Sequence, residues 1–363
     1  MNSFLKNKLS IIVIILLMAT TFSGCEIFPG VDINPIKEKD GGVFKSIEGG
    51  RSWQQKVKID EKNSIASKNM LCLAVDLKDT KNIYAGTKED GIYKSADGGE
   101  TWFKIDDENG ILNPKSSVYD IAVDPKDNNY IYATVFQENK GKVLKTSDGG
   151  KKWREIYLSQ APGDIITDIE LDFFDTRVIY LANSNGGFFK SANYGSSWEL
   201  KIFFERSIEK IIINPKNTNA IWIISGNQIY KSDDKGNNWQ SFEEGLKNAG
   251  SNRELTSLAI DPSNPNCVYV GSSQGILKTN DGGSSWSQVN IITPPQVVSI
   301  SDIAVHPANS LIIYYAAGSV LYKSIDGGTT WTIHNLRSGK TIKKILLDPS
   351  NPEIIYLGMC ENK

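Results

Sequence analysis

One recurring position in the sequence carries side chains that could perform acid–base or binding chemistry. Short apolar runs end in a turn signal such as Val123-Asp124-Pro125, and we take the residue four places before the turn residue in each run. Paired carboxylates across a cleft can act as acid and base in glycoside hydrolysis. Carboxylates mixed with ammonium groups can instead bind a polar ligand or peptide, or form a self-neutralising ring around a water-filled channel. These residues are Cys72, Asp120, Asp168, Lys210, Ser257, Asp302 and Lys344, and all except Cys72 are candidate ligand-binding residues.

Other kinds of catalytic or metal chemistry find little support in the residue pattern. His306 stands in a turn and His334 follows a tryptophan on another element, and neither has a candidate nucleophile beside it. The acidic stretch at residues 106–110 lacks the alternate-residue spacing of a calcium loop, and we expect a solvated loop there. No Cys/His spacing suggests a metal site. We therefore predict no catalytic residue, no metal and no cofactor.

The elements that position these residues are marked by a repeated tryptophan motif. Seven of the eight tryptophans close an eight-residue pattern that starts with Ser or Thr, has Gly fifth, and has Asp third in all copies except those with Glu48 and Asn193. The hydroxyl and carboxylate can accept backbone N–H groups of a tight turn, and the Gly supplies a positive φ. The Trp ring then packs against the turn. We assign structural roles to Ser46, Trp53, Asp97, Trp102, Asp148, Trp153, Trp198, Asp234, Trp239, Asp281, Trp286, Asp326 and Trp331.

Each unit of this repeat has the pattern of four short strands. An apolar run such as Ile121-Ala122-Val123 is followed by a turn, an aromatic strand such as Ile131-Tyr132, a loop, a third strand, the tryptophan motif and a fourth strand. Four strands in roughly 45 residues are typical of one propeller blade. The repeat region begins with half a unit, residues 42–53, and ends with the other half, residues 345–358. We predict an all-β, single seven-bladed propeller of four-stranded blades, one of them shared by the N- and C-terminal strands.

The motif resembles the Asp-box, or BNR repeat, of sialidases, sortilin ectodomains, xyloglucanases and photosystem II assembly factors, over residues 41–363. The nearest whole-chain resemblance is to the photosystem II stability and assembly factor family, which implies a non-enzymatic disc that holds a polypeptide or membrane-protein partner. Photosynthesis is not carried over, because one fold hosts many functions. Xyloglucanases that share this repeat use two propellers facing across a cleft, and sialidases need an arginine triad and an Arg-Ile-Pro segment. None of the six arginines here stands in that context.

The N-terminal segment predicts export. Lys6 and Lys8 precede an apolar run, and small residues lead to Cys25. The Ser-Gly-Cys ending resembles the bacterial lipobox, which implies lipidation of Cys25, although Phe22 departs from the usual aliphatic residue. An ordinary signal peptide or an uncleaved anchor is the alternative, and each places the body outside the cytoplasm. We divide the chain into a signal peptide (1–25), a tether (26–40) and the propeller (41–363).

Charge and cysteine content exclude some partners. The net charge of −2 gives no electrostatic reason to bind nucleic acid. Beyond Cys25, the odd number of cysteines, Cys72, Cys267 and Cys360, cannot all pair within one chain, and we expect buried thiols. The predicted function is a lipid-anchored, monomeric, non-enzymatic binding or assembly scaffold for a protein or membrane-protein partner. The alternative is a carbohydrate-active glycoside hydrolase with a glycan partner.

Overall fold

The computed structural model describes residues 40–250, 253–293 and 299–361 of the chain. The predicted signal peptide, the lipidated Cys25 and the tether up to residue 39 lie outside the described residues. The described residues belong to one compact unit. Asp40, the last residue of the predicted tether, is bonded to this unit, because its carboxylate accepts the N–H of Gly339 at 2.6 Å.

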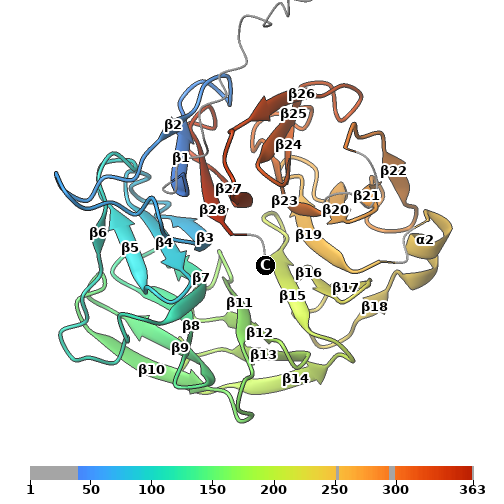
Figure 1. Cartoon of the computed structure of the whole chain (residues 1–363). Helices are drawn as coiled ribbons and strands as arrows, with labels where there is room; N and C mark the ends of the chain where they lie inside the picture. The colour runs from blue at the N-terminus through green and yellow to red at the C-terminus, as the bar shows by residue number, and fades with distance from the viewer. Residues whose placement is uncertain (1–39, 251–252, 294–298, 362–363) are drawn as a thin grey trace, which may run out of the picture. The chain divides into compact units, whose positions relative to one another are not determined.

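The described chain forms seven four-stranded antiparallel sheets around a central axis (Figure 1). Blade 1 consists of β3 (Met70–Val75), β4 (Ile83–Thr87), β5 (Ile92–Ser95) and β6 (Phe103–Lys104). Blade 2 consists of β7 (Ser117–Val123), β8 (Ile131–Gln137), β9 (Lys140–Thr146) and β10 (Trp153–Leu158). Blade 3 consists of β11 (Ile166–Leu171), β12 (Ile179–Asn183), β13 (Gly187–Ser191) and β14 (Glu199–Phe203).

The next three blades repeat this order, with one short helix added. Blade 4 consists of β15 (Ile208–Ile213), β16 (Ile221–Ser225), β17 (Gln228–Ser232) and β18 (Gln240–Ser241), followed by helix α2 (Glu243–Asn248). Blade 5 consists of β19 (Leu255–Ile260), β20 (Val268–Ser272), β21 (Gly275–Thr279) and β22 (Ser287–Val289). Blade 6 consists of β23 (Ile300–Val305), β24 (Ile313–Ala317), β25 (Val320–Ser324) and β26 (Thr332–Asn335).

Blade 7 is built from both ends of the described chain. Its strand order is β2 (Gln54–Gln55), β1 (Gly42–Ser46), β28 (Ile355–Cys360) and β27 (Thr341–Leu347). Strand β1 runs antiparallel to β28, with Gly42 opposite Met359 and Ser46 opposite Ile355. The innermost strand β27 also contacts β3, so the ring closes (Figure 1). This confirms the predicted fold class, blade number and shared blade.

The hydrophobic core lies between blades, where neighbouring sheets pack face to face. The second strand of each blade is almost entirely buried, and every residue of β12 and β16 is buried. One buried cluster joins Tyr132 and Val143 of blade 2 to Ile169 and Leu181 of blade 3. Because every sheet is covered on both faces by its neighbours, the inner strands can carry apolar residues on both sides.

The tryptophan motif forms a hairpin turn between the third and fourth strand of each blade. In all seven copies the first hydroxyl accepts the N–H of the fifth-position Gly at 2.7 to 3.1 Å. In blade 1, Ser95 also donates to Asp97 at 2.8 Å, and Asp97 accepts the N–H of Thr101 at 2.9 Å. Gly99 has a φ of 87°, in the region that Gly adopts without strain. Of the seven tryptophans, Trp102 and Trp153 are fully buried and the others are partly exposed.

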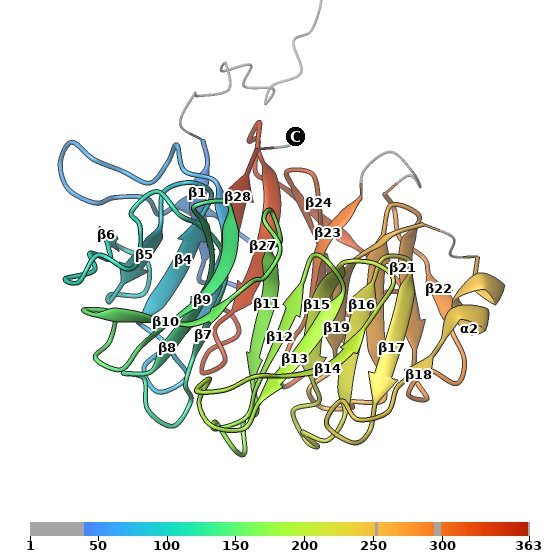
Figure 2. The same cartoon turned by 90° about the horizontal axis from the view of Figure 1, so that it is seen from below.

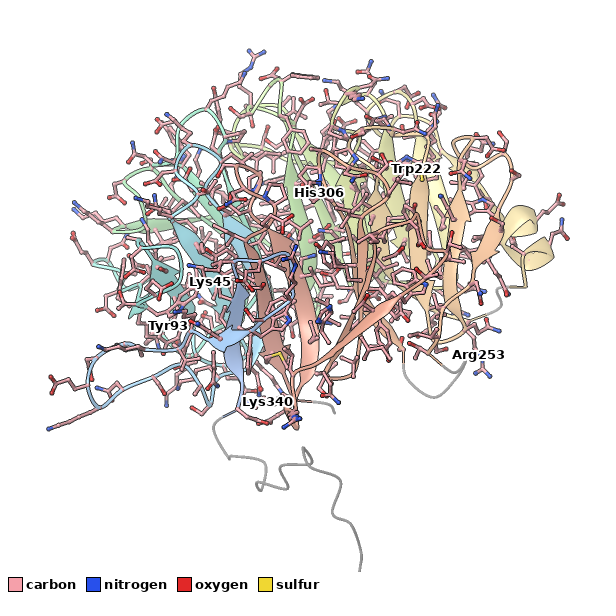
Figure 3. The ribbon with its side chains drawn as sticks, turned by 90° about the horizontal axis from the view of Figure 1, so that it is seen from above. Lys45, Tyr93, Trp222, Arg253, His306 and Lys340 are labelled. Atoms are coloured by element: carbon pink, nitrogen blue, oxygen red, sulfur yellow. The ribbon has the colours of Figure 1, made fainter. Side chains whose placement is uncertain are left out.

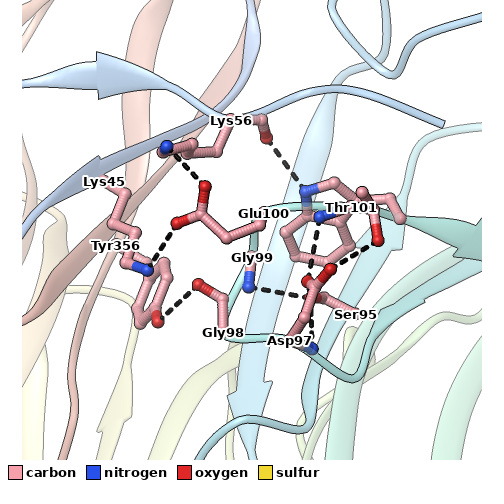
Figure 4. Close-up of polar contacts among 10 residues, drawn as sticks. Lys45, Lys56, Ser95, Asp97, Gly98, Gly99, Glu100, Thr101 and Tyr356 are labelled. Atoms are coloured by element: carbon pink, nitrogen blue, oxygen red, sulfur yellow. Dashed lines mark hydrogen bonds and ion pairs between the residues drawn. The ribbon is translucent and has the colours of Figure 1, made fainter. Parts of the chain in front are cut away.

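These turns also join one blade to the next (Figure 4). The hydroxyl of Tyr356 in blade 7 donates to the carbonyl of Gly98 in the turn of blade 1 at 2.9 Å. Glu100 of the same turn pairs with Lys45 at 2.9 Å and with Lys56 at 2.6 Å. The turn of blade 1 therefore holds the first and last strands of the described chain together.

A lysine before each motif is a structural signal that the tryptophan pattern did not include. In every blade this lysine lies over the aromatic ring of the second strand, with nitrogen-to-centroid distances of 5.1 to 5.8 Å. Such cation–π contacts are worth about 0.5–2 kcal/mol each, depending on burial. The lysines are Lys45, Lys94, Lys145, Lys190, Lys231, Lys278 and Lys323.

Candidate functional site at the channel mouth

Every innermost strand carries a β-bulge near its first residue. In β3, for example, Met70 pairs with Thr87 and Cys72 with Gly86, so the residue between them is an extra one. A bulge interrupts the strict alternation of a strand and re-aims side chains. The seven bulge residues are Leu71, Tyr119, Thr167, Glu209, Thr256, Ser301 and Lys343.

Three of the bulge residues are hydroxyl side chains that join adjacent blades. Thr167 donates to the carbonyl of Ile208 and Ser301 to that of Ile342, both at 2.6 Å. Thr256 donates in the same way to the next blade. In each case the acceptor is the residue just before the bulge of the following blade. The hydroxyl thus gives a backbone carbonyl of the next blade a hydrogen-bond partner.

The other four bulge residues depart from this pattern. Leu71, Tyr119, Glu209 and Lys343 make no side-chain hydrogen bond or ion pair with any described residue. Glu209 and Lys343 are exposed, and Leu71 and Tyr119 are partly exposed. These four side chains do not contribute the inter-blade bond that their counterparts supply, so they are available for a ligand.

The four residues line an open pocket of about 950 Å³ at the mouth of the channel. Thr256 and Ser301 also line it, so six of the seven bulge residues form its wall. Further charged side chains surround them: Lys88, Arg206, Glu254 and Glu361. Figure 3 labels Lys340 and Arg253 at this end of the propeller.

The residues predicted from the sequence lie one position deeper, directly after each bulge. None of them lines the mouth pocket. The Asp168 carboxylate instead accepts the N–H of Ile211 at 2.6 Å and pairs with Lys210 at 2.6 Å. These contacts join blade 3 to blade 4, and the arrangement recurs between blades 6 and 7.

In that second copy the carboxylate of Asp302 accepts the N–H of Ile345 at 2.8 Å and pairs with Lys344 at 3.2 Å. Ser257 donates to Asp302 at 3.3 Å. Asp120 accepts the N–H of Ile169 at 3.2 Å. The predicted ring therefore brings its charges together as inter-blade contacts, and a ligand at these residues stays a prediction.

The acidic part of this ring includes one residue that sequence reasoning missed. Glu170 lies two places after Asp168, on the same face of β11, and its carboxylate is 3.4 Å from the Lys210 ammonium. Burial raises the pKa of Glu170 to about 7, with a further contribution from the Asp168 charge. Burial and the charge of Asp168 also raise the pKa of Asp120. The alternation of a strand could have identified Glu170, because residues two apart share a face.

Basic neighbours compensate part of this acidic charge. Burial disfavours the charged form of Lys210, but the carboxylates of Asp168, Glu170 and Asp120 together raise the pKa of its ammonium. Lys210 therefore stays charged and fixes the carboxylates around it. A carboxylate that already accepts a backbone N–H and an ammonium is poorly placed to act as a nucleophile or as a general base.

The histidines, the acidic loop and possible metal ligands are the other candidates considered from the sequence. His306 lies in its turn as expected and accepts the N–H of Ala308 through Nδ1 at 3.1 Å. Burial lowers the pKa of His334 on β26. The acidic loop at residues 106–110 is largely exposed, as expected for a solvated loop. Within it, Asp107 accepts the N–H groups of Ile111, at 2.6 Å, and of Trp153 in the next blade. Across residues 40–250, 253–293 and 299–361, no cluster of three His, Cys, Asp or Glu side chains is arranged to hold a metal.

The sequence predicts buried cysteine thiols in the propeller. Cys72 and Cys267 are buried, Cys360 is half-buried at the mouth, and all three are free thiols. Burial raises the pKa of each of them. In the described part of the chain, no helix has the length and apolarity to cross a membrane.

Comparison with known proteins places this geometry among propellers. A family model described as "Sortilin, neurotensin receptor 3" (Sortilin-Vps10) matches residues 227–343. No curated protein sequence matches the chain. The chain is a seven-bladed Asp-box propeller. Its blades, motif turns and ring closure all agree with this assignment.

Two kinds of solved propeller are similar to this Asp-box propeller. The GH74 xyloglucanase of Xanthomonas campestris has 15% identity and a TM-score of 0.68 over 81% of this chain and 51% of its own. YCF48 of Cyanidioschyzon merolae has 18% identity and a TM-score of 0.61 over 81% of this chain and 97% of its own. YCF48 bound to a D1 peptide has 16% identity and a TM-score of 0.61, over 82% and 94%. The chain spans about half the length of the xyloglucanase, and these identities show the fold alone.

Proposed function

We propose that this propeller is an exported, lipid-anchored binding protein that holds a polypeptide segment of a partner, such as a membrane protein, in its mouth pocket. The proposal depends on one observation: four of the seven bulge residues lack the hydroxyl bond to the next blade that the other three make. Leu71, Tyr119, Glu209 and Lys343 stand where Thr or Ser joins the blades elsewhere, and each faces the pocket without a partner.

The composition of the pocket wall suits a polypeptide. Leu71 and Tyr119 offer apolar and aromatic surface, which anchors peptides with little loss of side-chain entropy. Glu209 and Lys343 offer charges of both signs beside them. A peptide can meet all of these, because it carries apolar, acidic and basic side chains on one backbone. The solved complex of YCF48 with a D1 peptide supports the same use for a propeller of this size.

Export and lipid anchoring rest on the N-terminal sequence. Lys6, Lys8, the apolar run and Cys25 have the order of a lipoprotein signal. Asp40 joins the propeller through Gly339, next to Lys340, whose ammonium donates to Asn69 of the pocket wall at 3.1 Å. The described chain therefore enters the propeller beside the mouth.

A photo-crosslinking experiment on the full chain in native membranes tests the binding proposal. A photoreactive phenylalanine at Tyr119 should give a polypeptide adduct, and the adduct should disappear when Glu209 and Lys343 are both changed to Thr. The matched control is the same probe at Tyr194, which is 40% exposed in a motif turn away from the mouth. Equal adducts at both sites, or an adduct at Tyr119 that ignores the two substitutions, would reject the mouth as the binding site.

A glycoside hydrolase is the second candidate, and one observation favours it. Asp120 contacts Asp168 in the channel, and its raised pKa is what a general acid requires. The backbone and ammonium contacts of Asp168 weigh against this function. A glycan-hydrolysis screen decides between the two: turnover that disappears in Asp120→Asn and Asp168→Asn variants would favour the hydrolase.

A further inference from the structure

We infer that the mouth is electrically dipolar and selects a polypeptide segment that carries an acidic residue at one end and a basic residue at the other. This inference rests on the proposed function and names the kind of segment that fits. Lys343 is the bulge residue of blade 7, and Lys88 lies at the end of β4 in blade 1. Glu209 is the bulge residue of blade 4, and Glu254 directly precedes β19 in blade 5.

The two pairs lie on opposite sides of the channel. Blades 7 and 1 are neighbours through β27 and β3, and blades 4 and 5 are neighbours through β15 and β19. Figure 1 shows β27 and β3 across the central axis from β15 and β19. All four charged residues line the same pocket. A segment lying across the mouth therefore meets lysines at one end and glutamates at the other.

The lysine side keeps an excess of positive charge, because Lys88, Lys343 and Lys340 stand against one carboxylate, that of Glu361. Lys88 and Lys343 have no ion-pair partner among the described residues. Glu361 pairs with the buried Lys340 at 3.4 Å. A hydrogen bond from Asn69 and the charges of Lys340 and Lys88 lower the pKa of Glu361, so this carboxylate offsets only part of the positive charge. Both Lys88 and Lys343 act electrostatically on Cys360 at the pocket wall, which places them around one point of the rim.

The glutamate side has an excess of negative charge, because Glu209 and Glu254 stand against one arginine of the pocket wall, Arg206. Glu254 lies 3.6 Å from Arg206, and both side chains are well exposed, so this pair is weak. Glu209 has no ion-pair partner among the described residues. Leu71 of blade 1, beside the lysines, and Tyr119 of blade 2, between the two sides, form the apolar part of the wall. The mouth thus has an order of charges, basic–apolar–acidic, that a peptide with the complementary order would match.

Binding of short synthetic peptides to the detergent-solubilised full chain tests this inference. The probes share one apolar, aromatic centre and differ in their ends: acidic and basic, acidic at both ends, basic at both ends, or uncharged. We expect the dipolar peptide to bind about fivefold more tightly than the uncharged one, from two or more partly exposed charge pairs. Thermal unfolding of every variant checks that the surface substitutions leave the fold intact.

Charge reversal sharpens the test. The Lys88→Glu/Lys343→Glu variant should lose the preference for the dipolar peptide and bind the doubly basic peptide best. Adding Glu209→Lys and Glu254→Lys should restore the dipolar preference, because the peptide can turn around. The matched control, Lys81→Glu/Lys151→Glu, changes two exposed lysines that lie outside the pocket and should leave the preferences unchanged.

The outcomes separate this inference from the proposed function. If all four peptides bind equally, and lose binding when Tyr119 is changed to Thr, the mouth binds peptides but the dipolar selection is wrong. If no peptide binds, or binding ignores both Tyr119→Thr and the reversals, the peptide-binding mouth is wrong as well. A preference that follows both reversals supports the dipolar mouth.

Discussion

The motif turns and the bulges are both repeated seven times, yet only the turns keep the same chemistry in every blade. Each turn has a hydroxyl that accepts the N–H of Gly, and each is preceded by a lysine over an aromatic ring. Three bulges have a hydroxyl that joins the next blade, whereas four have Leu71, Tyr119, Glu209 and Lys343. We interpret the uniform turn residues as serving the fold. The bulge residues differ between blades, so they are the better candidates for a function.

The largest expected loss of stability comes from a substitution in a motif turn. Changing the fully buried Trp102 to Ala removes its ring from the core and its indole bond to the carbonyl of Lys56 at 2.9 Å. We expect a loss of about 3–5 kcal/mol in the free energy of unfolding, measured with urea. Trp331→Ala, at a partly exposed copy, should cost clearly less. Equal losses of unfolding free energy would contradict the expectation that a buried motif tryptophan stabilises the fold more than a partly exposed one.

The next largest effect is a pH dependence of stability that comes from Glu170 on the innermost strand of blade 3. The pKa of Glu170 rises from 4.5 to about 7 on folding, so between about pH 5 and 7 the folded chain keeps a proton that the unfolded chain has lost. Stability therefore falls as pH rises through this window, by about 1–3 kcal/mol for this group. Urea unfolding at pH 5 and pH 8 should show a smaller fall for Glu170→Gln than for the native chain.

The exposed Glu199 provides the control for that measurement, because Glu199→Gln should keep the native pH dependence. A Glu170→Gln variant with the native pH dependence would contradict a buried, protonated Glu170.

A smaller effect is expected within a single turn. Asp97→Ala removes the acceptor of the Thr101 N–H and of the Ser95 hydroxyl, at 2.9 and 2.8 Å. We expect a loss of about 1 kcal/mol, as for other exposed side chains that cap backbone N–H groups. The same change at Asp106, which is exposed, should be nearly neutral. If both substitutions cost the same, the turn bonds contribute nothing specific.

The smallest expected effect has the opposite sign and comes from the mouth. Glu209→Thr would place a hydroxyl where Thr167 donates to the next blade, and its acceptor would be the carbonyl of Leu255. One such bond stabilises by about 0.5–1.5 kcal/mol. We expect a modest rise in the free energy of unfolding. Thr256→Val, which removes such a bond in blade 5, should lower it, and a fall in both variants would contradict the bulge rule.

The sequence predicted the ring well because its signals are local and repeated. The Ser95-to-Trp102 pattern fixes a hairpin through bonds within eight residues, and the two half-units at the ends can be completed only by each other. The predicted residues also lie on the innermost strands, as Asp168 and Asp302 show, although they lie outside the mouth pocket.

The mouth could not be predicted in the same way, because it depends on the bulges. A bulge adds one residue to the alternation, so a count back from the turn reaches Asp120 rather than Tyr119. The partners of Asp168, namely Lys210 and the N–H of Ile211, belong to another blade and are more than forty residues away in the chain. Only the packed ring shows that predicted residues of neighbouring blades contact one another, whereas six of the seven bulge residues that precede them line the pocket.

One measurement tests the central claim most directly, namely that the four departures serve binding and not stability. The variant that combines Leu71→Thr, Tyr119→Thr, Glu209→Thr and Lys343→Thr gives the mouth the bulge chemistry of blades 3, 5 and 6. Its unfolding and its capture of the partner crosslinked at the mouth are measured side by side with the native chain. We predict equal or greater stability and loss of capture. Reduced stability with capture intact would contradict the claim.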